Sequence, residues 1–158
     1  MKIKLTKGHP AMPMDIEELQ REVGGELPPS FIDFLQHHDG AKPETNSFKI
    51  GYTNGSGVNG FIPLGDILSA RGNIDALPTT AFPIAWTEGG NYVFIDMAAD
   101  GSVFFWDHEQ PERPTLLASD FASFVNMLEP FDPTSIKLRP GQVTSAWIDP
   151  DFLKSLDQ

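Results

Sequence analysis

The sequence has 158 residues and a formal net charge of -11, with a pI near 4.6. This length suits one domain that buries its own hydrophobic core. The negative charge has the wrong sign for binding phosphate backbones, so we expect no direct nucleic-acid partner. The sequence contains no cysteine, which excludes a disulfide scaffold, a thiolate metal site and a cysteine nucleophile.

The amino-terminal segment 1–7 alternates basic and apolar residues and lacks the continuous apolar core of a secretory signal. No other stretch approaches the length needed to span a membrane. We therefore expect a cytoplasmic protein with no membrane partner. The sequence also suggests no cofactor.

Two short helices are predicted near the start of the chain. The first covers 15–23, where apolar residues recur at helical spacing behind a capping-box pattern, Asp15 followed by Glu18. The second begins in the segment 27–30, because proline is tolerated in a first helical turn, and it ends before Gly40.

An antiparallel sheet is predicted in the middle of the chain. The segment 41–62 is rich in Gly, Asn, Ser and Thr, which indicates short edge strands joined by a loop. Three aromatic and β-branched runs follow, separated by glycine-containing turn signals, and we expect them to be consecutive antiparallel strands. These runs are 82–86, 91–96 and 102–106.

A further helix, with Ser119 as its N-cap and Leu117 on its apolar face, is predicted to cover the sheet. These elements predict an α+β fold, a single domain with a mainly antiparallel sheet and short helices packed on it. We assign the domain to 1–130. The remaining segment, 131–158, contains apolar residues such as Trp147 and is expected to dock on the same domain.

The order of these signals resembles the SUKH superfamily, which includes fungal cell-wall-assembly regulators and bacterial immunity proteins encoded beside polymorphic toxins. The resemblance spans roughly Asp15 to Leu128 and implies a binding domain whose toxin-contacting surface differs between members. The chain departs from the family pattern at Asn91, where an acidic residue is common. The resemblance depends on 16–19, 27–31 with 39–40, 89–96, 103–109 and 118–124.

The segment Trp106-Asp107-His108-Glu109 is the strongest candidate for catalysis, because a histidine between carboxylates can act as a general base or metal ligand. We favour a strand end with solvated charges, since geometry rather than adjacency defines a catalytic base. His37 and His38 are similarly interpreted as residues of a helix C-terminus rather than as metal ligands.

Acidic residues concentrate in the third of the chain that contains the predicted strands. We expect strand ends and loops there to form an acidic surface that attracts a basic partner, with aromatic anchors supplying close contacts. The alternative is a set of core aromatics beneath a solvated rim, and the sequence leaves both open. The predicted partner-binding residues are Glu88, Tyr92, Asp100, Trp106, Asp107, Glu109 and Glu112.

The sequence and the resemblance together predict a non-enzymatic immunity protein that binds and neutralises a cognate toxin effector domain. A basic nuclease is the toxin that fits the negative charge best. One alternative is an intracellular scaffold or regulatory domain that binds another protein. A less favoured alternative is a small metal-dependent hydrolase that uses His108 with Asp107 or Glu109.

Overall fold

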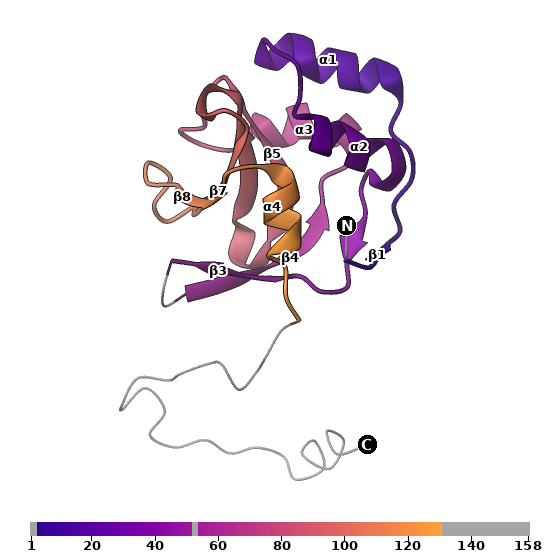
Figure 1. Ribbon diagram of the computed structural model, residues 1–158. Helices are drawn as coiled ribbons and strands as arrows, with labels where there is room; N and C mark the ends of the chain where they lie inside the picture. The colour runs from indigo at the N-terminus through magenta and orange to yellow at the C-terminus, as the bar shows by residue number, and fades with distance from the viewer. Residues whose placement is uncertain (1–2, 52–53, 131–158) are drawn as a thin grey trace, which may run out of the picture.

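A six-stranded antiparallel sheet forms the centre of the molecule, with strand order β3-β4-β5-β6-β7-β8 (Figure 1). The computed structural model describes residues 3–51 and 54–130. Each strand of this sheet pairs with the strand that follows it; short turns join β5 to β6 and β6 to β7, whereas a longer segment that contains α3 joins β4 to β5. The strands are β1 (Leu5–Thr6), β2 (Lys42–Pro43), β3 (Ser47–Ile50), β4 (Asn54–Phe61), β5 (Ala81–Thr87), β6 (Tyr92–Asp96), β7 (Ser102–Trp106) and β8 (Thr115–Ala118).

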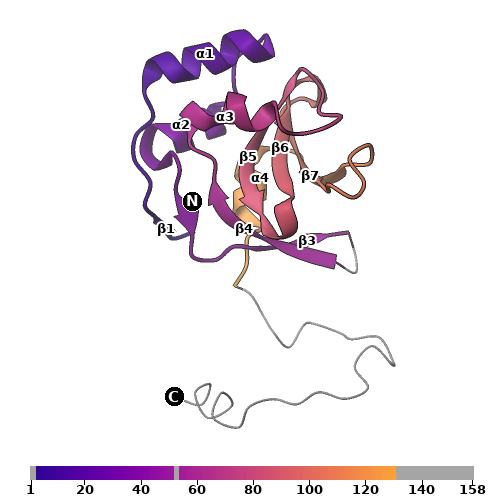
Figure 2. The same cartoon turned by 180° about the vertical axis from the view of Figure 1, so that it is seen from behind.

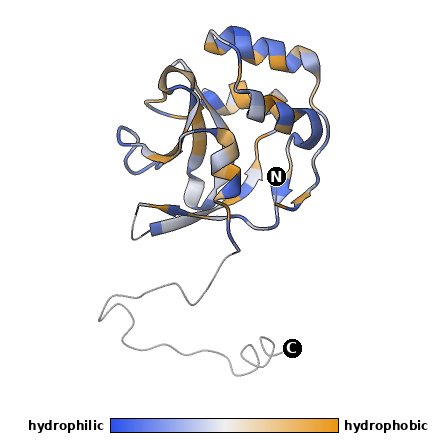
Figure 3. Cartoon of the chain, in the orientation of Figure 1, coloured by the Kyte–Doolittle hydropathy of each residue, from blue (hydrophilic) through white to orange (hydrophobic). Residues whose placement is uncertain are grey.

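Four α-helices accompany the sheet in the described residues, and α4 lies across one of its faces (Figures 1 and 2). The strands β1 and β2 form a separate two-stranded sheet. Both hydrophobic and hydrophilic residues recur along α1 and α4, as expected of helices that bury one side (Figure 3). The helices are α1 (Pro13–Val23), α2 (Pro29–His38), α3 (Leu64–Arg71) and α4 (Phe121–Asn126), with the 3-10 turns η1 (Glu88–Gly90) and η2 (Met97–Ala99).

The main hydrophobic core lies between α2, α4 and the inner face of the sheet. Its centre is aromatic: the ring centroids of Phe34 and Phe61 are 4.7 Å apart, and Phe121 lies 5.1 Å from both Phe31 and Phe34. Edge-to-face contacts of this kind stabilise a pair by about 1 kcal/mol beyond area burial. Phenylalanines from three elements, α2, β4 and α4, therefore hold these helices against the sheet.

A smaller cluster covers part of the outer face of the same sheet. It joins Phe94 of β6 and Trp106 of β7 to Ile74, which lies in the connection between α3 and β5. The indole Nε1–H of Trp106 donates a hydrogen bond to the backbone oxygen of Asp75 at 3.1 Å. The connection is therefore held against the outer face by both apolar packing and a hydrogen bond.

The helix starts differ from the predicted caps. The first helix begins at Pro13, two residues before Asp15, and its N-cap Met12 makes no side-chain capping bond. The predicted capping box is therefore wrong, because proline at the first helical position starts the helix earlier. The N-cap of α4 is Asp120, one residue beyond the predicted Ser119.

Two strands were also misjudged from the sequence. The strand β4 has eight residues and pairs on both sides, so it is an interior strand that includes part of the predicted loop. Leu117 lies in β8 instead of on the face of the last helix. Local composition did not predict β4 or β8 correctly. Pairing with neighbouring strands decides whether a segment of weak strand propensity forms a strand.

The α+β fold with a mainly antiparallel sheet and short packed helices is confirmed. The predicted docking of 131–158 lies outside the described residues. Within 3–51 and 54–130, no helix is both long enough and apolar enough to cross a membrane.

Candidate partner-binding surface

Five of the predicted binding residues belong to one end of the sheet, where β5 and β7 end and β6 begins. The turn η1 and the loop between β7 and β8 both leave the sheet at this end. Asp100 is the exception, because it lies in the turn between β6 and β7 at the opposite end. The five residues are Glu88, Tyr92, Trp106, Asp107 and Glu109, and Glu112 follows in the same loop.

A side-chain contact ties the two connections at this end together. The side-chain oxygen of Asn91 accepts a hydrogen bond from the backbone N–H of His108 at 3.0 Å and lies 2.7 Å from the ring Nδ1 of His108. A backbone N–H can only donate, so the Asn91 atom is the amide oxygen and the nearby Nδ1 carries its proton. The Nε2 atom of a neutral ring is then an acceptor.

The carboxylates beside His108 do not orient its ring. Asp107 accepts a hydrogen bond from the backbone N–H of Glu109 at 2.9 Å, a local turn interaction. A catalytic histidine or a metal site needs convergent carboxylate or histidine partners. The described residues contain no group of three or more histidine or acidic side chains placed to hold a metal ion. Within the described residues, His108 therefore has no ready-made set of metal ligands around it.

The aromatic residues of this region form one row across the outer face of the sheet. Trp86 of β5 pairs with Tyr92 of β6, which pairs with Trp106 of β7. Trp106 is 6% exposed beneath the connection that contains Asp75, whereas Trp86 is 39% exposed. The structure therefore offers Trp86, which the sequence did not single out, as the accessible tryptophan of this row.

Glycines on the neighbouring strand β4 leave space beside this row. Gly60 pairs with Trp86, and a Cβ atom built on Gly60 would lie 3.8 Å from the indole. A Cβ atom on Gly57 would lie 3.4 Å from Oε1 of Glu88. The absence of side chains at these positions lets the indole and the carboxylate lie against the strand.

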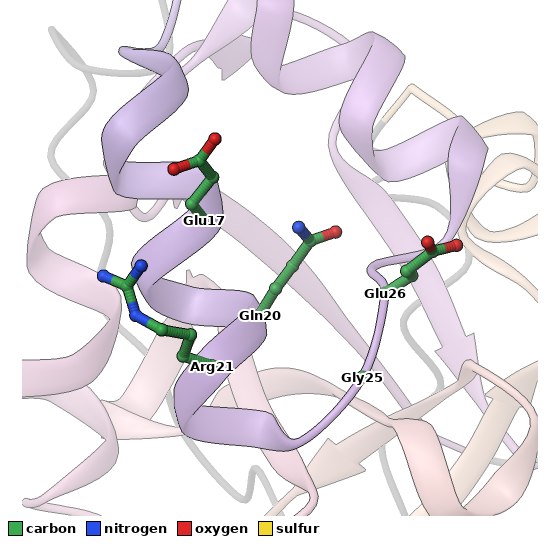
Figure 4. Close-up of a pocket in the computed structure, with 5 residues that line it drawn as sticks. All are labelled: Glu17, Gln20, Arg21, Gly25 and Glu26. Carbon is green, nitrogen blue, oxygen red and sulfur yellow. The ribbon is translucent and has the colours of Figure 1, made fainter.

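Two open depressions mark the described surface. One, of about 520 Å³, is lined by Glu109–Arg113 in the loop after β7. The other, of about 400 Å³, lies where α1 ends, and Figure 4 shows Gln20 reaching from α1 toward the segment that contains Glu26. The Gln20 side-chain oxygen accepts a hydrogen bond from the backbone N–H of Leu27 at 3.0 Å. That contact has a structural role, because it fixes the connection from α1 to α2.

The perturbed carboxyl groups lie away from this end of the sheet. Burial raises the pKa of Asp39, although its Oδ1 accepts a hydrogen bond from the backbone N–H of Leu64 at 2.8 Å. The hydrogen bond from the backbone N–H of Ser123 lowers the pKa of Asp120. Asp39 joins α2 to the start of α3, and Asp120 caps α4, so both act in the fold.

Comparison of the sequence with models of known families identifies one match. Residues 10–127 match the model of the SMI1 / KNR4 family (SUKH-1). The chain belongs to this family. The matched region contains the six-stranded sheet and all four α-helices of the described residues. It also contains the acidic end of the sheet, where Glu88, Asp107 and Glu109 lie. The SUKH resemblance inferred from the sequence is thereby confirmed.

A relative in Bacillus subtilis (strain 168) is described as "SPbeta prophage-derived uncharacterized protein YokK". It is 29% identical to this SUKH-1 chain over 136 residues, with 70% of each protein covered.

Proposed function

We propose that this SUKH-1 protein is a non-enzymatic immunity protein, which binds a cognate bacterial toxin in the cytoplasm and neutralises it by blocking its active site or substrate channel. Family membership supports a protein-binding role. The relative described as prophage-derived comes from a bacterium, which agrees with a bacterial toxin as the partner.

The acidic end of the sheet is the observation on which the proposal rests. Glu88, Glu109 and Glu112 are exposed, and Asp107 is half-buried. None of the four takes part in the ion pairs found within 3–51 and 54–130, which join Lys4 to Glu44 and His37 to Asp33. Carboxylates that have no ion-pair partner among the described residues accelerate association with a basic surface and favour partners of opposite charge.

A nuclease is the toxin class that fits this surface best. Nucleases that act on DNA or RNA present cationic surfaces to phosphate groups, and an acidic inhibitor competes for the same surface. This choice follows from charge alone. The inhibition itself needs stoichiometric affinity and no chemistry by the inhibitor.

The experiment is binding to the toxin domain encoded beside this gene, measured by titration calorimetry at two salt concentrations. We expect one-to-one binding that weakens as salt rises, and growth rescue when both proteins are expressed together. The triple variant Glu88→Gln, Glu109→Gln, Glu112→Gln should lose affinity.

A matched control removes the same charge from α1, through Glu17→Gln, Glu18→Gln and Glu22→Gln, all at exposed positions. If the two triple variants lose the same affinity, the carboxylates of the sheet end act only through the net charge of the protein. Absence of binding to the neighbouring toxin, together with capture of another cellular protein by the same sheet end, would favour the scaffold or regulatory function.

A further inference from the structure

The exposed Trp86 and the acidic Glu88 are two residues apart where β5 ends and η1 begins. The intervening Thr87 has extended backbone angles, φ -124° and ψ 173°. Residues two apart in an extended chain point to the same side and are separated by about 7 Å. The side chains of Trp86 and Glu88 thus leave the sheet on its outer face together.

Glu88 has no cationic partner among the described residues. Its Oε1 instead lies over Gly57, where even a methyl group would be in van der Waals contact with it. The structure thus places this exposed carboxylate beside Gly57 and the indole beside Gly60, two glycines of the same strand β4.

A guanidinium group matches this pair better than other side chains do. Its planar cation stacks on an indole, the aromatic ring that attracts cations most strongly. Its fork of N–H groups donates two parallel hydrogen bonds to a carboxylate, which a lysine ammonium cannot do. Tryptophan and arginine are also the residues most enriched at the energetic centres of interfaces.

We infer that Trp86 and Glu88 form the docking site for an arginine side chain of the partner protein. The inference rests on the proposed function, which makes that partner the toxin. The surroundings contain further carboxylates, since Asp107 and Glu109 follow β7 at the same sheet end. Lys42 is a cation close to the site, because its alkyl chain also lies beside Gly60.

The first test compares variants for binding to the neighbouring toxin domain. Trp86→Ala should weaken binding by about 30-fold, the loss expected at an energetic centre of an interface. Trp86→Phe keeps an aromatic ring and should lose less. Glu88→Gln should lose about tenfold and should also reduce the dependence of the affinity on salt. Lys42→Met should strengthen binding, because it removes a like charge from the side of the site.

Two control variants match the removal of an apolar side chain and the removal of a carboxylate. Leu116→Ala removes an apolar side chain, 60% exposed, from β8, three strands away from Trp86. Glu22→Gln removes an exposed carboxylate from α1, outside the sheet. Both controls should stay within about twofold of the natural protein, the range expected of surface positions away from an interface centre. Circular dichroism and a melting curve for each variant separate lost binding from lost folding.

A second test needs no toxin. A hexa-arginine peptide should shift the indole N–H resonance of Trp86 in NMR titrations and leave that of the buried Trp106 in place. Hexa-lysine should shift it less, and Glu88→Gln should reduce the arginine response.

The outcomes separate the two proposals. If the toxin binds the natural protein, Trp86→Ala and Glu88→Gln equally well, the arginine site is overturned while the immunity function stands. If the arginine peptide shifts Trp86 but the toxin does not bind, the immunity function fails while the arginine site stands. Equal responses to the arginine and lysine peptides would overturn the specificity for a guanidinium group.

Discussion

The side-chain oxygen of Asn91 meets both the backbone N–H and the ring of His108, at 3.0 Å and 2.7 Å. Asn91 immediately precedes β6, and His108 is two residues beyond the end of β7, so one acceptor joins the connections on either side of the strand pair. A carboxylate at position 91 supplies the same acceptor geometry. This explains in physical terms how an asparagine occupies a position where the family commonly has an acidic residue.

Removing this acceptor should increase the local opening of the loop between β7 and β8, which contains His108 and Glu109. In Asn91→Ala the backbone N–H of His108 loses its partner, and we expect a cost of about 1 kcal/mol, the usual net contribution of a hydrogen bond. Hydrogen exchange at the His108 amide should become faster, while Asn91→Asp should keep it slow. Unchanged exchange in Asn91→Ala would show that the loop is held by other contacts.

Trp106 should matter for stability more than for binding. Trp106→Phe keeps a ring in the outer cluster but removes the donor to the backbone oxygen of Asp75. We expect a loss of about 1 to 2 kcal/mol in the free energy of unfolding, measured by urea denaturation. Affinity for the partner should stay close to that of the natural protein. A large loss of affinity with unchanged stability would instead place Trp106 in the interface.

The three central strands and the fold class could be predicted because their sequence signals are local. Runs such as 91–96 combine β-branched and aromatic residues with glycine turns, and they form β6 and its neighbours. The full length of β4 could not be predicted, because its Asn54–Gly57 segment has weak strand propensity and is ordered by pairing with β3. Long-range pairing of this kind leaves little trace in a single sequence.

The sequence shows an acidic concentration at 88–112, and the structure places most of these residues at one end of the sheet, while their role in binding stays a prediction. The sequence could not show which tryptophan is exposed to a partner. Trp86 and Trp106 both end aromatic strand runs, but the α3–β5 connection covers Trp106 and leaves Trp86 open. Which strand a loop crosses is decided by tertiary packing, and no spacing of residues reports it.

Replacing the cap of α4 should destabilise the protein in a pH-dependent way. The carboxylate of Asp120 accepts a hydrogen bond from the backbone N–H of Ser123 at 2.7 Å, and this bond lowers the pKa of Asp120 below 3.8. Asp120→Ala should cost about 1 kcal/mol at neutral pH, as is typical of N-cap substitutions. A lowered pKa stabilises the fold above pH 3.8, and this contribution is lost as pH falls through the folded value.

The control for this experiment is the adjacent residue. Ser119→Ala removes the side chain first predicted as the cap and should change stability less, because it removes only a minor interaction with Asp120 and leaves Asp120 as the cap. Thermal melts at pH 7 and pH 2.5 compare the two variants. A deficit of Asp120→Ala that is equally large at both pH values would contradict the charged cap.

The buried carboxyl group of Asp39 should have the opposite pH dependence. Burial raises its pKa above 3.8, so the folded protein holds this proton more tightly than the unfolded chain does. Its contribution to stability is therefore largest below pH 3.8 and declines as pH rises through the raised folded value. Asp39→Asn keeps an oxygen acceptor for the backbone N–H of Leu64 and removes the charge, so at neutral pH it should be neutral or stabilising.

Asp39→Ala provides the contrast, because it leaves the Leu64 N–H at the start of α3 without its acceptor. We expect it to cost about 1 to 3 kcal/mol at neutral pH, the penalty for an unsatisfied buried donor. Urea denaturation from pH 3 to pH 7 should show the stability of Asp39→Asn rising relative to the natural protein as pH increases. A relative stability that falls over this range would show that the charged form of Asp39 is favoured by the fold, against the direction that burial predicts.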